Sequence, residues 1–167
     1  MDKLEFVKVD NDDLVFEVES LACFIWREYF PSLIGEAQVE YMLDKLQSKK
    51  AISQQLKEGY SYYLVRGETG KYAGYFCIQP QADKLFISKI YLKSDVRGKG
   101  FGKKILLFIE KLAEQMGYSK VWLTVYKENT SSIKFYEKSG FKLAGSIVTD
   151  IGGGFIMDDY KMEKLLK

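Results

Sequence analysis

Glycines alternate with basic and aromatic residues in one segment of the chain, Arg97-Gly98-Lys99-Gly100-Phe101-Gly102-Lys103. Glycine tolerates the tight bends that bring successive backbone N–H groups toward one anion. The amphipathic stretch that follows predicts a helix, and a helix N-terminus adds oriented donors and a partial positive charge. Because the arginine and the lysines add full charges, the segment predicts a site for a diphosphate or a similar group.

Two common nucleotide motifs do not fit this segment. A dinucleotide-binding fingerprint needs a third glycine where Lys103 stands. A P-loop needs Ser or Thr after Gly-Lys, but Gly102-Lys103 is followed by Lys104. A flexible basic turn that binds nothing stays open as the alternative at this point.

The chain contains no histidine. Ser-His-Asp and Cys-His catalysis are therefore excluded, and so are the usual imidazole-ligated metals, so that no metal site is expected. Any proton transfer must use Tyr, Asp, Glu, Lys or water.

Composition sets the class of protein. A chain of 167 residues fits one domain, expected over residues 1–167. The 25 basic and 23 acidic residues leave a net charge of +2, which does not favour a nucleic-acid partner. No apolar run approaches the ~20 residues that span a bilayer, and no signal peptide is evident, so we expect no membrane partner and a cytoplasmic location. Cys23 and Cys77 lie in apolar runs and are expected to be buried thiols.

Hydrophobic periodicity predicts a mixed α/β sheet of about seven strands. Asp10 and Asp13 indicate the start of the first helix, which Pro31 ends. A later helix places Ile105, Ile109, Leu112 and Met116 on one face, and Gly117 ends it. Strands are predicted over residues 4–9, 60–66, 71–79, 85–92, 120–126, 141–149 and 155–165, and further helices over residues 36–47, 50–58 and 129–139.

The glycine segment resembles the Gln/Arg-x-x-Gly-x-Gly/Ala loop of the GCN5-related N-acetyltransferase (GNAT) superfamily. The resemblance continues through Val121–Val125, Asn129 and the run Ile133–Phe141, and it ends in Asp159–Lys164. These motifs cover the chain from about Tyr60 onward and occur in the family's order.

The resemblance implies an α/β fold with a mixed, mostly antiparallel sheet, helices on both faces and a splay at a β-bulge. It also implies acetyl-CoA as co-substrate, with its pyrophosphate on the glycine loop and its pantetheine arm on backbone groups of the strand that ends at Leu92. Through it, the following residues are expected to bind the cofactor: Ile90, Tyr91, Leu92, Arg97, Gly98, Lys99, Gly100, Phe101, Gly102, Lys103, Asn129 and Lys138.

By the same resemblance, Tyr136 is the candidate general acid for the leaving thiolate. A phenol of pKa ~10 can protonate a thiolate of pKa ~8.5. The alternative is a helix tyrosine that serves only the core.

The general base is left open. Many family members carry Glu where this chain has Ser88, and serine cannot act as that base alone. Glu28, Tyr91, Asp158 and an ordered water remain candidates. The role of the segment Gly152-Gly153-Gly154 is also open.

By the same resemblance, two segments are expected on the acceptor side, Trp26–Phe30 and Phe155–Tyr160; the alternative is that they are only the end of a core helix and a hairpin turn. Their aromatic and acidic residues suit a small amine or polyamine through cation–π contact and charge pairing. Because side chains alternate along a strand, at most one of Asp158 and Asp159 can face a pocket. The alternatives are a protein or peptide N-acetyltransferase, a non-enzymatic acyl-CoA-binding module and a nucleotide-binding protein of another fold. Family members are often dimers, so a homodimer is compatible with the resemblance.

Overall fold

The computed structural model describes residues 3–167, which divide into two compact units. The first unit comprises the described residues up to Gln79 together with Lys89–Lys104, and the second comprises Pro80–Ser88 and Ile105–Lys167. The prediction of one domain over residues 1–167 is not decided by this division and stays a prediction.

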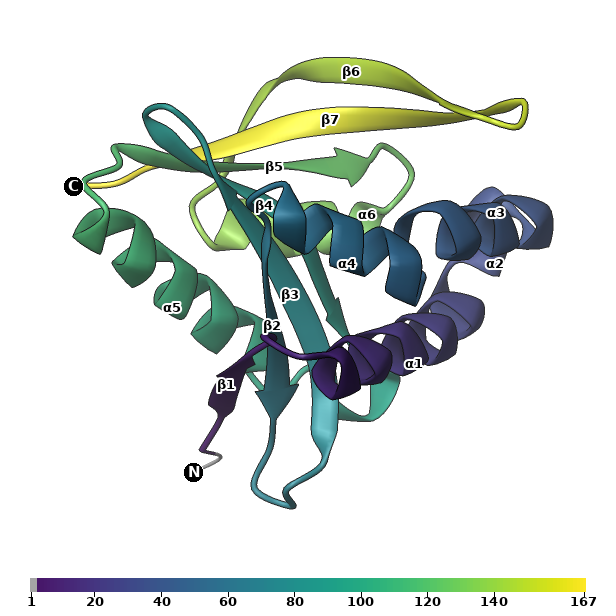
Figure 1. Cartoon of the computed structure of the whole chain (residues 1–167). Coiled ribbons are helices and arrows are strands. Elements are labelled where there is room, and N and C mark those ends of the chain that lie inside the picture. The colour runs from purple at the N-terminus through teal and green to yellow at the C-terminus, as the bar shows by residue number, and fades with distance from the viewer. Residues whose placement is uncertain (1–2) are drawn as a thin grey trace. The chain divides into compact units, whose positions relative to one another are not determined.

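The order of elements follows the predicted one closely (Figure 1). The strands are β1 (Glu5–Lys8), β2 (Ser61–Arg66), β3 (Tyr72–Pro80), β4 (Lys84–Leu92), β5 (Lys120–Tyr126), β6 (Lys142–Gly152) and β7 (Phe155–Leu165). The helices are α1 (Asp12–Tyr29), α2 (Pro31–Ile34), α3 (Glu36–Leu46), α4 (Lys49–Lys57), the 3-10 turn η1 (Ser94–Val96), α5 (Phe101–Gln115) and α6 (Thr130–Lys138).

The sheet has seven strands in the order β1-β2-β3-β4-β5-β7-β6. β4 and β5 run parallel, whereas β1 with β2, β2 with β3, β5 with β7 and β6 with β7 pair antiparallel. The predicted mixed, mostly antiparallel sheet is therefore confirmed.

Helix α1 begins one residue later than predicted. Its cap is Asn11, whose side-chain oxygen accepts a hydrogen bond from the Leu14 N–H at 3.0 Å, so Asp10 is not the capping residue. Asn11 has the extended backbone that a capping residue needs, with φ −148° and ψ 167°. Pro31 ends α1 as predicted, but it also starts the short helix α2, which was not predicted. Proline is favoured there because the first helical N–H has no intrahelical partner.

Strand β3 forms the centre of the first unit's core. Its residues from Ala73 to Ile78 are all buried, with no alternation between the two faces. Unbroken burial of this kind indicates a strand that is covered on both faces.

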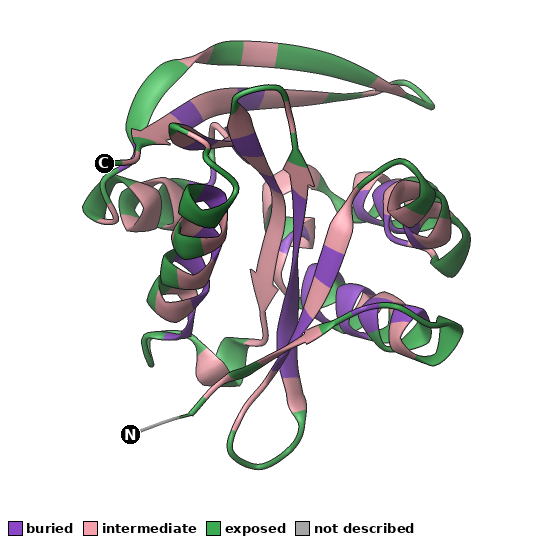
Figure 2. Cartoon of the chain, turned by 60° about the vertical axis from the view of Figure 1, so that its left-hand side comes forward, coloured by how far each residue is buried: buried purple, intermediate pink, exposed green. Residues whose placement is uncertain are grey.

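A long hairpin, β6–β7, belongs to the second unit (Figure 1). Its turn is Gly153-Gly154, with φ 63° and 82°, and positive φ at both central residues fits a two-residue hairpin turn. The Asp150 carboxylate accepts a hydrogen bond from the Gly152 N–H at 2.8 Å and so supports the approach to the turn. β6 is exposed or half-buried along its whole length, as Figure 2 shows.

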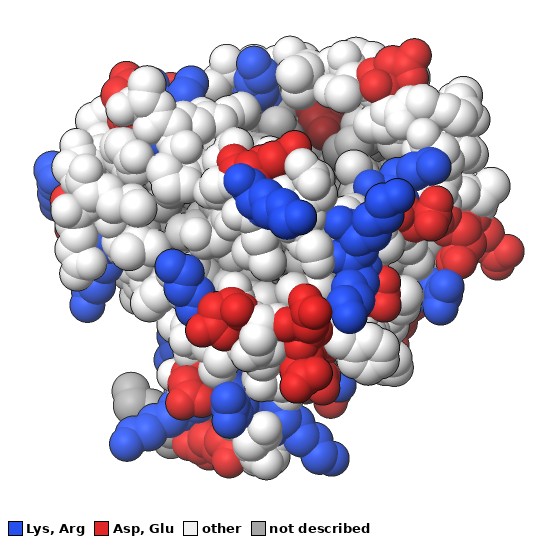
Figure 3. Space-filling model, viewed as in Figure 1, with Lys and Arg blue, Asp and Glu red and all other residues white. Residues whose placement is uncertain are grey.

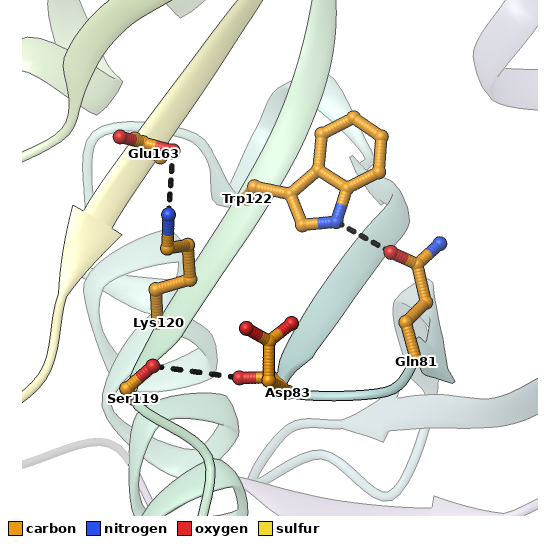
Figure 4. Close-up of polar contacts among 6 residues, drawn as sticks. All are labelled: Gln81, Asp83, Ser119, Lys120, Trp122 and Glu163. Atoms are coloured by element: carbon orange, nitrogen blue, oxygen red, sulfur yellow. Dashed lines mark hydrogen bonds and ion pairs between the residues drawn. The ribbon is translucent and has the colours of Figure 1, made fainter.

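Polar contacts join the start of β4 to β5 and β7 in the second unit (Figure 4). The Trp122 Nε1–H donates to Gln81 Oε1 at 2.9 Å, and Lys120 Nζ lies 3.4 Å from Glu163 Oε2. The first contact joins the segment before β4 to β5, and the second joins β5 to its antiparallel neighbour β7.

The apolar face of α5 differs slightly from the predicted one. Ile105 and Ile109 are fully buried, but Met116 is 45% exposed, and Leu106 and Ala113 are buried instead. Met116 lies beyond the last helical residue, Gln115, and so leaves the stripe.

The mixed surface charge fits the balanced composition, and one of the two cysteines is buried as predicted. Lys and Arg intermingle with Asp and Glu on the face drawn in Figure 3. Within residues 3–167, no helix is long and apolar enough to cross a membrane. Both cysteines are free, and Cys77 is buried as expected, but Cys23 is only half-buried.

A close approach of β3 to β4 gives a test of the first unit. A Cβ at Gly74 would lie 2.2 Å from the Tyr91 carbonyl oxygen and 3.0 Å from the Leu92 Cα. Because backbone must shift to relieve this clash, we expect Gly74→Ala to lower the free energy of unfolding by about 1–3 kcal/mol. Denaturant unfolding measures the change.

Gly67→Ala is the matched control, since its Cβ would meet nothing closer than the Phe101 ring at 3.9 Å. Equal stability of the two variants would contradict the clash.

Candidate active site

The glycine loop has the conformation that its sequence requires. Gly98 and Gly100 adopt positive φ, 77° and 84°, and a Cβ on either would meet nothing within 4 Å. The loop is exposed, and the Lys104 N–H bonds to the Gly100 carbonyl at 3.2 Å as α5 begins. Open space above a glycine-rich helix start leaves room for an anion, so these residues fit the pyrophosphate that the sequence predicts.

Arg97 has a role that the sequence did not reveal. Its Nε and Nη2 donate to the Leu92 carbonyl oxygen at 3.1 and 2.8 Å, and its guanidinium lies 4.8 Å from the centroid of the Tyr29 ring. The side chain therefore ties the loop to the end of β4 and stacks on the end of α1. A lysine could not make this forked contact.

The end of β4 is held at several points. The Lys93 N–H donates to the Ala73 carbonyl at 2.9 Å, next to the close approach at Gly74. Ile90, Tyr91 and Leu92 are half-buried. Their predicted backbone contact with the pantetheine arm and the predicted splay at a β-bulge stay predictions.

The aromatic residues at the end of α1 pack as core. Trp26 and Phe30 are 3% and 8% exposed, and their ring centroids lie 5.2 and 5.9 Å from that of Tyr91. Tyr91 also lies 5.6 Å from the Tyr75 ring. The expectation that Trp26 and Phe30 offer open aromatic faces to an acceptor gains no support from this packing.

A half-buried lysine on β4, Lys89, was not identified in the sequence analysis. The Lys89 ammonium donates to Gln55 Oε1 at 2.9 Å and to the Tyr62 hydroxyl at 2.7 Å, and the Tyr62 hydroxyl in turn donates to Gln55. Burial lowers the pKa of Lys89 and raises that of Tyr62 well above its ordinary range. No sequence motif marks such a lysine, because its hydrogen-bond partners, Gln55 and Tyr62, are distant from it in the sequence.

The second unit carries the remaining predicted cofactor residues. Asn129 is 7% exposed and precedes α6, but its side chain makes no capping bond; it accepts from Ser131 Oγ at 3.4 Å. Tyr136 is half-buried, with its ring 5.3 Å from Phe135 and 5.7 Å from Phe141. Lys138 ends α6 and is exposed. These residues share one helix and the turn before it.

The candidate bases have very different surroundings. Glu28 is exposed on α1, whereas Asp158 pairs with Lys127, whose Nζ lies 3.0 Å from Asp158 Oδ1. Asp159 is 4% exposed, and burial together with the charge of Asp158 raises its pKa to about 6. Alternation along β7 places the two carboxylates on opposite faces, as the sequence predicts for such a pair.

The structure gathers the predicted residues in two groups. Ile90 to Lys103 lie together in the first unit, and Asn129, Tyr136 and Lys138 lie together in the second. The role of each residue toward a cofactor stays a prediction.

The model of the acetyltransferase (GNAT) family matches residues 20–141. The chain belongs to this family. The prediction that this protein is an N-acetyltransferase is thereby confirmed, and so is the predicted α/β fold with a mixed sheet.

The chain is similar to polyamine acetyltransferases, over most of its length in one case and over less than half of it in another. A spermidine N(1)-acetyltransferase of Thermoplasma acidophilum is 26% identical over 159 residues, which are 93% of this chain and 96% of that protein. A spermine/spermidine N(1)-acetyltransferase of Bacillus subtilis is 28% identical over 75 residues, 44% of this chain and 48% of that protein. Among solved structures, the PaiA N-acetyltransferase of Thermoplasma acidophilum in complex with coenzyme A has a TM-score of 0.80 at 22% identity, covering 98% of this chain and 99% of that one.

The left-handed glycine in the loop gives the test of this site. A valine at position 100 would force a β-branched residue into positive φ and place methyl groups where the backbone must approach a phosphate. We expect Gly100→Val to weaken the binding of acetyl-CoA by more than tenfold, measured by calorimetry.

Gly59→Val is the control, because Gly59 also has a positive φ, 95°, and open space at its Cβ, but it lies outside the loop. Unchanged affinity in a folded Gly100→Val variant would contradict a backbone cradle.

Proposed function

We propose that this protein transfers an acetyl group from acetyl-CoA to a primary amine of a small polyamine, by direct attack in a ternary complex. The observation that carries the proposal is the exposed loop with left-handed Gly98 and Gly100 at the start of α5, in a chain of the GNAT family. The T. acidophilum relative, which aligns over 93% of the chain, supports the choice of a polyamine.

The chain's own residues divide the work. Backbone donors of the loop would hold the pyrophosphate, with Lys99 and Lys103 as nearby charges. Acetyl-CoA supplies an acetyl thioester, and holding it beside an amine removes an entropic barrier that can exceed ~7 kcal/mol.

Tyr136 would supply the proton that the departing thiolate needs. Its hydroxyl is the only part of the side chain that can donate this proton, and its ring contacts the rings of Phe135 and Phe141. A tyrosine fixed by its ring and active through its hydroxyl suits a general acid.

The first prediction of the proposal concerns that hydroxyl. We expect Tyr136→Phe to lower kcat by about 10²–10⁴-fold, the usual worth of general acid assistance, with little change in acetyl-CoA affinity. Thiol release measures kcat, and calorimetry measures the affinity.

Tyr118→Phe is the control, since it removes a half-buried hydroxyl from the segment between α5 and β5. Wild-type turnover in Tyr136→Phe would assign Tyr136 to the core alone.

The second prediction concerns the acceptor. A dication gains from charge pairing with carboxylates more than a monocation does. We expect kcat/KM for spermidine to exceed that for a monoamine of equal length, and the ratio to fall as salt screens the charges. Steady-state rates at low and high salt measure this.

Equal rates for both amines would end the polyamine assignment. Activity on peptides alone would replace the small amine with a protein acceptor.

A further inference from the structure

Asp159 is a buried carboxylate without a bonded partner. Only 4% of its surface is exposed. Anywhere in residues 3–167, no hydrogen bond or ion pair reaches its carboxylate oxygens. An isolated buried charge is costly, because water no longer solvates it and nothing replaces that solvation. The charge of Lys127 acts on Asp159 without a bonded contact, so the carboxylate can still receive an external cation.

The ammonium of Lys127, whose charge acts on Asp159, pairs with a different carboxylate. Lys127 follows β5, and its Nζ lies 3.0 Å from Asp158 Oδ1 and 5.4 Å from the centroid of the Tyr160 ring. Asp158 also raises the pKa of Lys127 through a hydrogen bond. Lys127 therefore neutralises the neighbouring carboxylate.

Few other ionisable groups face Asp159 from the strands around it. β5 places Tyr126 opposite, and β6 places Ile147 opposite, within a stretch, residues 146–149, that contains no ionisable side chain. Along the same face of β7 comes Lys161, whose ammonium lies 5.9 Å from the Trp122 ring centroid.

These surroundings determine the pKa of the Asp159 carboxyl group. Burial, and next the charge of Asp158, raise the pKa of Asp159 to about 6, while Lys127 opposes the rise. At neutral pH the group is mostly ionised, yet its conjugate acid titrates close to working pH. Efficient general bases have pKa values in that range.

The position of Asp159 adds a second, independent reason. Its partner on β5 is Tyr126, whose carbonyl accepts a hydrogen bond from the Asn129 N–H at 2.9 Å. Helix α6, which carries Tyr136, begins at the next residue. Asp159 therefore lies beside the turn that leads into the helix of the proposed acid.

We propose that Asp159, rather than Asp158, receives the ammonium of the acceptor and takes its proton, an assignment that rests on the proposed function. The ammonium first passes one proton to the carboxylate oxygen, and the free amine nitrogen then bonds to the acetyl carbon. The thioester C–S bond breaks with its electron pair on sulfur, which takes a proton from Tyr136. The second N–H proton leaves the nitrogen as the amide forms and restores the Tyr136 hydroxyl, and Asp159 later returns its proton to water. Asp159 is in this sense a catalytic residue.

The pH dependence of kcat/KM for spermidine tests the assignment. Wild type is expected to gain activity as pH rises through about 6. In Asp159→Asn, the rise of kcat/KM with pH through about 6 (the acid limb) is expected to disappear. At neutral pH its kcat/KM should be at least ~10²-fold lower than that of wild type, as when a general base is removed. Its rate should approach that of wild type near pH ~10, where amines deprotonate in solution.

Two variants serve as controls. Asp158→Asn should keep an acid limb, because Asp159 remains, but the limb should move to lower pH, because the charge of Asp158 no longer raises the pKa of Asp159. Asp159→Glu keeps a carboxylate and should restore part of the activity. A limb that persists in Asp159→Asn, or one that vanishes in Asp158→Asn instead, would overturn the assignment.

Thermal unfolding separates this role from a structural one. Because the folded-state pKa of Asp159 is raised, its ionisation destabilises the fold as pH rises from about 4 to above 6. Asp159→Asn should therefore raise Tm at pH 7.5, and the gain should shrink near pH 4. A large fall in Tm at both pH values would make Asp159 a structural residue and overturn the proposal.

Failure of the proposed function would be recognised separately. It would show as an absence of wild-type thiol release with every amine tried. Calorimetry with spermidine would then decide the assignment: weaker binding to Asp159→Asn than to wild type supports it, and equal affinities overturn it.

Discussion

The forked hydrogen bond from Arg97 to the Leu92 carbonyl is the contact on which the candidate site depends. Without it, an exposed loop with left-handed glycines would have many conformations, and fixing even one backbone residue costs about 1–2 kcal/mol. The fork anchors the loop to the end of β4, and the Tyr29 ring supports the guanidinium from α1. β4 is itself set by the absence of a side chain at Gly74. These successive contacts together hold the loop in one conformation.

The polar groups around Tyr75 and Lys89 in the first unit differ from Asp159 in the second unit. Tyr75 donates to Gln47 at 2.8 Å, and Lys89 meets two neutral oxygens, so these polar atoms are satisfied within the first unit. Asp159 in the second unit is not satisfied in this way. Satisfied networks stabilise and specify a core, whereas an unsatisfied charge stores free energy that a ligand can release. This contrast distinguishes a structural lysine from a functional aspartate more clearly than burial alone.

Much of the fold was readable from the sequence because its signals are local. Glycine at positive φ marked the ends of helices, as at Gly59, Gly117 and Gly140. Periodicity found every strand, because β-formers and turn residues alternate clearly along the chain. The misses were also local: Asn11 competes with Asp10 for the same cap, and α2 is too short for any period.

The candidate site was only partly readable. The glycine loop and Tyr136 carry recognisable motifs, but the grip of Arg97 on Leu92 depends on a contact that charge alone does not predict. The alternation of side chains along a strand predicts that Asp158 and Asp159 face opposite sides of the sheet. Only the position of Lys127 in the structure shows that Asp158 has an ion-pair partner and that Asp159 has none among the described residues. Trp26 looked like an acceptor surface, and its burial against Tyr91 required the tertiary packing.

The tip of the β6–β7 hairpin shows that exposure and mutational tolerance are separate properties. Gly152, Gly153 and Gly154 are exposed, and all three hold positive φ. A Cβ at Gly154 would touch nothing, yet any L-residue there would be strained by its own backbone. A survey that ranks sites by contacts would class this tip as free to vary. Selection should instead preserve its glycines, because among substitutions at Gly154 only a D-amino acid would adopt this backbone without strain.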